Sequence, residues 1–126
     1  MYNEEKFRKV GYLNERLKAF GYAFQGLADF FRSGAHPKIH LLAILLISLL
    51  GFYFSISAGE WTAVLICCAL VLSMEALNSA LEYLTDLASP DIHPLAKKTK
   101  DIAAAAVLIS AVFSLIIALI IFIPKF

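Results

Sequence analysis

Long apolar stretches dominate the second half of the chain. Residues 41–59 and 102–123 contain no charged side chain. Each stretch is long enough to cross the roughly 30 Å of bilayer hydrocarbon as a helix. A third apolar stretch begins at Trp61 and continues, without a helix breaker, through a more polar segment to about Asp86. The pattern therefore predicts three membrane-spanning helices, over about residues 39–57, 61–86 and 101–123.

A different periodicity precedes the first span. Apolar residues recur there in steps of three and four, which places them on one face of a helix; they are Leu13, Leu17, Phe20, Phe24, Leu27 and Phe31. This spacing predicts an amphipathic helix over about residues 3–33, which either lies at the cytoplasmic membrane surface or caps the bundle of spans. Gly34 and Pro37 end it, since proline disfavours helix in the residue before it.

Composition and charge support a membrane protein with a defined orientation. Hydrophobic residues make up 60% of the chain, more than one soluble core of this size buries. Seven of the eleven Lys and Arg residues precede position 41, and three more lie at positions 97–100, whereas the turn at 55–61 has none. The positive-inside rule then places the N-terminus and the loop near residues 87–100 in the cytoplasm. We expect one membrane-embedded, multi-pass domain over residues 1–126, without a cleavable signal peptide or a nucleic-acid partner.

Four polar residues form a stripe along the second span. Glu75, Asn78, Glu82 and Asp86 follow one another at steps of three, four and four, so they project from nearly one side of a helix. A carboxylate within hydrocarbon costs at least ~2.5 kcal/mol and is by default a functional candidate. The deeper Glu75 is suited to act as a general base and the shallower Glu82 to bind a divalent cation. Alternatively, Glu75 and Asn78 only fix helix packing through hydrogen bonds.

Polar groups that suit phosphate follow this stripe. Asp91 and His93 lie in the next loop, and Lys100 and Asp101 open the third span. Phosphoryl transfer needs a metal, cationic neutralisation, alignment and a base, and these residues supply candidates for each. The sequence has no glycine-rich phosphate loop, which excludes P-loop enzymes and protein kinases.

Four segments strongly resemble the prokaryotic integral-membrane diacylglycerol kinase family, which includes the undecaprenol kinases: GYAFQGL (21–27), IHLLA (39–43), EALNSALEYLTD (75–86) and SPDIHPLAKKTKDIAAAAVLI (89–109). The resemblance implies a homotrimer of three-span subunits in the bacterial cytoplasmic (inner) membrane, with active sites shared between subunits at the cytoplasmic surface. It also implies transfer of the γ-phosphate of ATP, with Mg²⁺, to a lipid hydroxyl of diacylglycerol or undecaprenol.

The same resemblance assigns roles to individual residues. It implies a catalytic base at Glu75, a polar residue of the same site at Asn78 and a metal-binding carboxylate at Glu82. The implied nucleotide site draws on three segments, namely Tyr22 beside the adenine, Asp91, Ile92 and His93 in the loop, and Lys100 and Asp101 at the phosphates. Asp86 also coincides with a family aspartate, and Arg16 lies near the position of a basic residue of the site.

One departure from the family pattern leaves alternatives open. Gly34 stands where the family has a glutamate that joins the Glu82-type carboxylate in binding metal. Either Asp29 or His36 replaces it, or metal binding is weaker, or the activity is altered. The departure motivates a second hypothesis, a non-catalytic homologue that binds lipid or nucleotide. A third hypothesis is a small transporter that uses Glu75 as a proton relay. We interpret His40 as part of the entry of the first span at the membrane interface.

Overall fold

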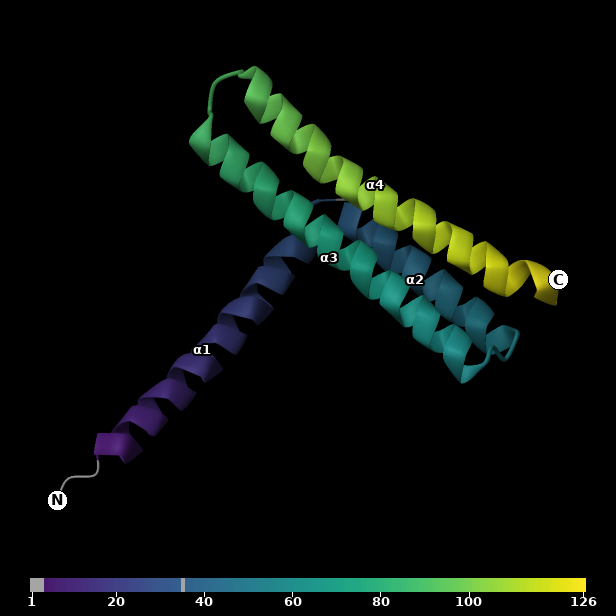
Figure 1. Cartoon of the computed structure of the whole chain (residues 1–126), viewed down its shortest axis with the longest axis horizontal. Helices are drawn as coiled ribbons and strands as arrows, with labels where there is room; N and C mark the ends of the chain where they lie inside the picture. Colours follow the sequence, from purple (N-terminus) through teal and green to yellow (C-terminus); the bar gives the residue numbers. More distant parts are fainter. Residues whose placement is uncertain (1–3, 35) are drawn as a thin grey trace. The chain divides into compact units, whose positions relative to one another are not determined.

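The structure is a computed structural model that describes residues 4–34 and 36–126, with side chains from residue 11 onward. It contains the helices α1 (Glu4–Arg32), α2 (His36–Tyr53), α3 (Ala58–Ala88) and α4 (Pro94–Phe122), followed by a 3₁₀ turn at Ile123–Lys125 (Figure 1). These residues include no β-strand, which confirms the predicted all-α fold. The predicted start of the first helix, at about residue 3, lies outside the described residues.

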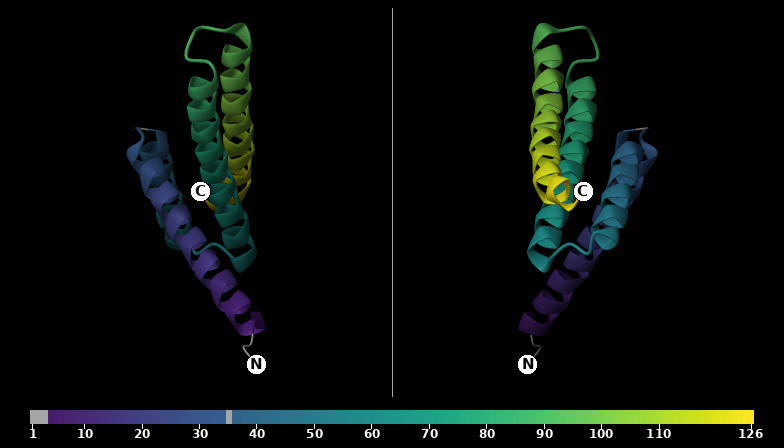
Figure 2. Two further views of the ribbon diagram at one scale, coloured as in Figure 1. Left: turned by 90° about the vertical axis from the view of Figure 1, so that its left-hand side faces the viewer. Right: turned by 90° about the vertical axis from the view of Figure 1, so that its right-hand side faces the viewer.

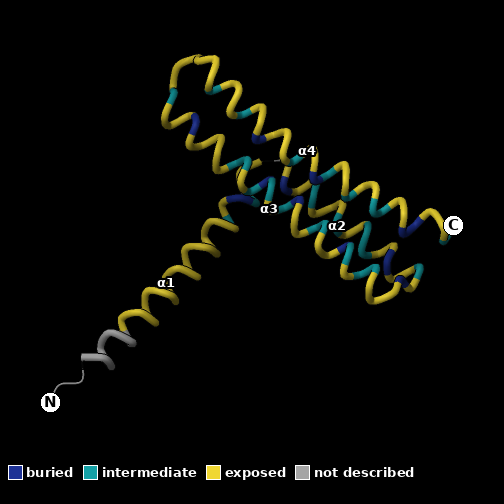
Figure 3. The backbone as a smooth tube through the Cα atoms, in the orientation of Figure 1, coloured by how far each residue is buried: buried dark blue, intermediate teal, exposed yellow. Residues whose placement is uncertain are grey.

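The helices α2, α3 and α4 are each long and apolar enough to cross a membrane, as the sequence pattern predicts. Most of their side chains are exposed, and buried positions are few and scattered (Figure 3). A soluble protein with so much exposed leucine and isoleucine would aggregate, whereas lipid or further protein can cover such a surface. The exposure of these helices therefore agrees with a membrane-embedded protein.

α3 and α4 form the main helix pair of the unit that spans residues 35–126. They lie side by side and antiparallel, as both views of Figure 2 show. Small residues of α4, Ala103 and Ser110, are buried in this unit, which allows helices to approach closely.

α4 begins at Pro94, well before the predicted span, because the His93 ring caps it and proline is favoured in the first turn. The lysines at 97, 98 and 100 therefore lie within the helix.

The turn between α2 and α3 is fixed by a capping box. The Ser57 backbone N–H donates to Glu60 Oε2 at 2.7 Å, and the Glu60 N–H donates to Ser57 Oγ at 3.2 Å. Glu60 also pairs with Lys125 at 3.1 Å, which ties this turn to the end of α4. A small apolar core lies beside the turn and contains Ile56, Val64, Ile121 and Phe122. Residues 58–60, which the predicted spans leave in the turn between them, thus belong to the first turn of α3.

α1 forms a compact unit of its own with residues up to Gly34. Its side chains from Gly11 to Leu27 are exposed, and its apolar residues recur along one face. Ser33 ends the helix by donating from its hydroxyl to the Phe30 carbonyl at 2.7 Å. The predicted amphipathic helix is therefore present, and its placement at the membrane surface stays a prediction.

The packing of Gly51 on Trp61 yields a prediction about stability. A Cβ atom at Gly51 would lie 2.8 Å from two atoms of the Trp61 indole ring, closer than real contacts allow. We expect Gly51→Ala to lower the free energy of unfolding by about 1–3 kcal/mol, measured by denaturant titration in detergent micelles. Gly59→Ala is the matched control, because its Cβ would meet only Ser57 Oγ at 4.0 Å. Equal stability of the two variants would contradict this packing.

Candidate functional site

The site is built around Glu75, a buried carboxylate in the middle of α3. Glu75 is 7% exposed, and its Oε1 lies 2.8 Å from His40 Nε2. α2 supplies His40 from its second turn, so the contact joins the first span to the second. Burying a charge is costly unless a partner is present, and the imidazole is that partner here. His40, interpreted from sequence as an interfacial residue, is thus a direct neighbour of the candidate base.

Asn78 and Glu82 continue the polar stripe toward the end of α3. Asn78 Nδ2 donates to Glu82 Oε1 at 3.3 Å, and Glu82 is exposed. Asn78 Oδ1 is buried and accepts no hydrogen bond within the described part of the chain. An unsatisfied buried acceptor is uncommon in native structures and points to a missing donor such as a ligand or water. From Glu75 to Glu82 the helix rises by ~10 Å, so the stripe connects a buried carboxylate with an exposed one.

The last member of the stripe interacts with α4 instead. Asp86 Oδ1 lies 2.5 Å from Lys100 Nζ. Lys97 pairs with Asp101 at 2.5 Å, one helical turn apart. Both candidate phosphate-binding residues of α4 are therefore held in ion pairs on the surface, and Asp86 orients Lys100 toward the end of α3.

The loop between α3 and α4 exposes Asp91, Ile92 and His93. His93 Nδ1 accepts the Leu95 backbone N–H at 3.1 Å, which caps α4 and leaves Nε2 free of that contact. A fully exposed isoleucine in a polar loop is suited to contact a bound molecule or a neighbouring chain. The structure thus places the three loop residues at the same end of the unit as Asp86 and Lys100.

Two parts of the predicted site stay predictions. Tyr22 is exposed on α1, where the Arg16 guanidinium lies 4.9 Å from the ring centre of Tyr12. α1 belongs to the separate unit, so the roles of Tyr22 and Arg16 stay predictions. Gly34 offers no side-chain ligand, and the replacement of its family carboxylate by Asp29 or His36 also stays a prediction.

The described residues include no group of three metal-ligating side chains. Mg²⁺ is commonly bound through one or two carboxylates plus substrate phosphates rather than by an all-protein cage. The exposed carboxylate of Glu82 fits that mode of binding. The part of the chain that is described is thus compatible with a metal that enters together with a nucleotide.

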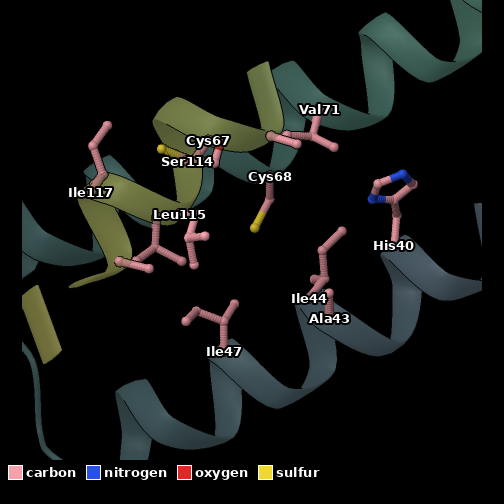
Figure 4. Close-up of a pocket in the computed structure, with 13 residues that line it drawn as sticks. His40, Ala43, Ile44, Ile47, Cys67, Cys68, Val71, Ser114, Leu115 and Ile117 are labelled. Atoms are coloured by element: carbon pink, nitrogen blue, oxygen red, sulfur yellow. The ribbon is translucent and has the colours of Figure 1, made fainter. Parts of the chain in front are cut away.

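An apolar cavity of about 230 Å³ lies next to the His40–Glu75 contact, between α2, α3 and α4. Its walls include Ile44, Ile47, Cys68 and Ser114, and the His40 ring lies at one end (Figure 4). Cys67 also lines this space and, like Cys68, is a free thiol. Both cysteines thus line the apolar interior next to the site.

Sequence reasoning missed one residue of this site, His40. The signal available was a lone ionisable side chain at the head of the uncharged stretch 41–59, inside the segment IHLLA. Its partner lies 35 positions away, so no local periodicity relates the two residues.

Comparison with known proteins identifies the family. The model of the prokaryotic diacylglycerol kinase family matches residues 21–122. The undecaprenol kinase of Bacillus subtilis (strain 168) is 38% identical over 113 residues, which cover 90% of this chain and 92% of that protein. The diacylglycerol kinase of Pseudomonas aeruginosa is 39% identical over 95 residues, 75% of this chain and 76% of that protein. The diacylglycerol kinase of Escherichia coli (strain K12) is 30% identical over 100 residues, which cover 79% of this chain and 82% of that protein. The chain belongs to the prokaryotic diacylglycerol kinase family.

Proposed function

We propose that the chain is a lipid kinase that transfers the γ-phosphate of ATP to undecaprenol, with Glu75 as the general base. Kinase activity follows from the family, in which ATP is the phosphate donor. The observation that supports the site most strongly is the arrangement along α3. A buried carboxylate is paired with His40, and the phosphate-binding candidates lie further along at the exposed end. A lipid hydroxyl arrives from the membrane and ATP from water, so the two substrates meet along this helix.

Undecaprenol is the proposed acceptor because of the extent of the sequence match. The Bacillus subtilis undecaprenol kinase matches over 92% of its length, and the two diacylglycerol kinases match over 76% and 82% of theirs. Diacylglycerol is the alternative acceptor, because the chain is also similar to the diacylglycerol kinases.

The proposed reaction uses groups at two depths. Glu75 Oε2 takes the proton from the lipid hydroxyl while the hydroxyl oxygen forms a bond to the γ-phosphorus and the bond to the ADP oxygen breaks. Asn78 Oδ1, buried and without a hydrogen bond among the described residues, accepts a hydrogen bond from the bound substrate. Lys100 neutralises phosphate charge, and Asp86 holds it in place. Asp91 and His93 contact the nucleotide from the loop.

Glu82 is the proposed ligand of Mg²⁺. The ion would supply neutralisation of the charge on the ATP phosphates. The Glu82 carboxylate is exposed and lies within hydrogen-bond distance of Asn78, so it can orient a nucleotide relative to the same helix that holds Glu75. Because glycine at position 34 offers no carboxylate, Glu82 is the proposed side chain that contributes most to Mg²⁺ binding.

We further propose that three copies assemble in the inner membrane with their N-termini in the cytoplasm. The apolar faces of α2, α3 and α4 are largely exposed in a single chain, so neighbouring copies have surface to cover. Glu60 lies at one end of the α3–α4 pair, and the other end carries Lys97, Lys98 and Lys100. Under the positive-inside rule, these lysines agree with a cytoplasmic site.

Replacement of the base provides the direct test of this function. Glu75→Gln keeps the size of the side chain and an oxygen that can accept from His40. We expect kcat to fall by at least ~100-fold, since a general base typically contributes on the order of 10²–10⁴. The assay is transfer of labelled γ-phosphate to undecaprenol and to diacylglycerol, with thermal unfolding as the control for folding. Turnover of neither lipid by the unmutated protein would refute the proposed function, and faster turnover of diacylglycerol would refute the choice of acceptor.

The role of Glu82 predicts a changed requirement for Mg²⁺. Glu82→Gln should raise the Mg²⁺ concentration for half-maximal activity by on the order of tenfold or more, because it removes a charged ligand. Glu15→Gln, which removes an exposed carboxylate from α1, is the control. Identical Mg²⁺ titrations for the two variants would show that Glu82 does not bind the metal.

The role of Lys100 predicts weaker binding of ATP. Lys100→Met should raise KM for ATP by roughly tenfold or more, because charge-assisted hydrogen bonds to phosphate are among the stronger ones. Lys98→Met is the matched control, since Lys98 is exposed and forms no ion pair within the described residues. The kinetic assay compares KM for ATP in both variants. If KM for ATP rises equally in the two, the effect is one of general surface charge, and the specific role of Lys100 at the phosphates is contradicted.

A further inference from the structure

We propose that His40 is a positioning residue for this reaction, whose Nε2–H holds one oxygen of Glu75 so that the other oxygen faces the lipid hydroxyl. The proposal rests on the proposed function, because it requires Glu75 to be the base. It assigns a role to a residue of α2, whereas the other groups proposed for chemistry lie on α3, α4 and the loop between them.

The contact has the geometry of a strong hydrogen bond. His40 Nε2 and Glu75 Oε1 are 2.8 Å apart, and their side chains are 22% and 10% exposed. A carboxylate that acts as a general base is ionised and has no proton to donate, so in the proposed arrangement the nitrogen carries the hydrogen. A hydrogen bond shielded from water in this way is stronger than an exposed one and restricts the rotation of the carboxylate.

The surroundings leave His40 as the partner of Glu75. On α4, no titratable side chain lies between Asp101 and Lys125. On α3, the thiols of Cys67 and Cys68 lie on the cavity wall, and Glu82, two turns from Glu75, accepts a hydrogen bond from Asn78. On α2, His36 and Lys38 are exposed. Among the described side chains, His40 forms the one hydrogen bond recorded for the Glu75 carboxylate.

Holding one oxygen has a defined chemical consequence. Oε1 is occupied by the imidazole N–H, so proton transfer from the lipid hydroxyl goes to Oε2. His40 keeps its own proton throughout, and Glu75 later releases the acquired proton to water at the exposed end of α3. A base whose orientation is set by a third group is the general arrangement for activating a hydroxyl nucleophile.

The competing explanation is that the pair only joins α2 to α3. Under that explanation, loss of the contact lowers stability but leaves the kinetics of the folded protein unchanged. A positioning role instead predicts a fall in kcat at an unchanged KM for ATP, and recovery when a different N–H donor replaces the imidazole.

The experiment compares His40→Leu, which removes the donor, with His40→Gln, which retains an N–H donor, in the labelled-phosphate assay. We expect His40→Leu to lower kcat by ~10- to 100-fold with KM for ATP changed by less than about twofold. His40→Gln should recover at least part of the lost kcat. Because the two residues act as a unit, His40→Leu should add little to the loss caused by Glu75→Gln.

The outcomes separate this proposal from the proposed function. If Glu75→Gln retains full activity, the base assignment itself fails. If Glu75→Gln is inactive while folded His40→Leu keeps full kcat, or if His40→Leu and His40→Gln lose kcat equally, the positioning role is refuted.

A measurement on the unmutated protein covers the case in which His40→Leu does not fold. The ¹⁵N NMR signals of the His40 ring identify which nitrogen bears hydrogen. A protonated Nε2, perturbed in Glu75→Gln, supports the proposal. An Nε2 without hydrogen would overturn it.

Discussion

A carboxylate within an apolar helix bundle requires a polar partner, and the organisation of this protein follows from that requirement. Glu75 is buried near an apolar cavity between α2, α3 and α4, where an ionisable group costs at least ~2.5 kcal/mol without compensation. His40 supplies the compensation from α2 at 2.8 Å. One contact therefore joins two spans and holds the side chain that the family resemblance implies as catalytic. Removing His40 would leave Glu75 buried without its hydrogen bond.

The site extends from this pair toward water, and its groups change character along the way. Glu75 is buried, Asn78 has one buried oxygen without a partner, and Glu82 is exposed. Beyond them, the Asp86–Lys100 ion pair connects the end of α3 to the start of α4. This gradient suits a reaction between a substrate dissolved in the membrane and a charged nucleotide in the cytoplasm. Three carboxylates of one helix thus have different environments because of their depth, although they project from nearly the same side of that helix.

Much of this arrangement could be predicted from the sequence because it depends on local periodicity. Uncharged stretches predict the spans, and steps of three and four predict the polar stripe that begins at Glu75. The pairing of His40 with Glu75 could not be predicted, since it depends on how α2 packs against α3. The same holds for Asp86 and Lys100, which meet only because the loop at 89–93 returns α4 alongside α3. The early start of α4 was also missed, because the lysines at 97–100 suggested a loop where a histidine cap and Pro94 begin a helix.

The central claim is that a lipid hydroxyl and the phosphates of ATP meet along α3, with the hydroxyl at Glu75 and the phosphates at Glu82 and Lys100. The most direct measurement is an experimental structure of the protein in lipid with a non-hydrolysable ATP analogue, Mg²⁺ and a lipid alcohol. The account predicts the γ-phosphate between Glu82 and Lys100, and the lipid hydroxyl within hydrogen-bond distance of Glu75 Oε2. A nucleotide bound away from these residues, or a lipid hydroxyl out of reach of Glu75, would contradict it.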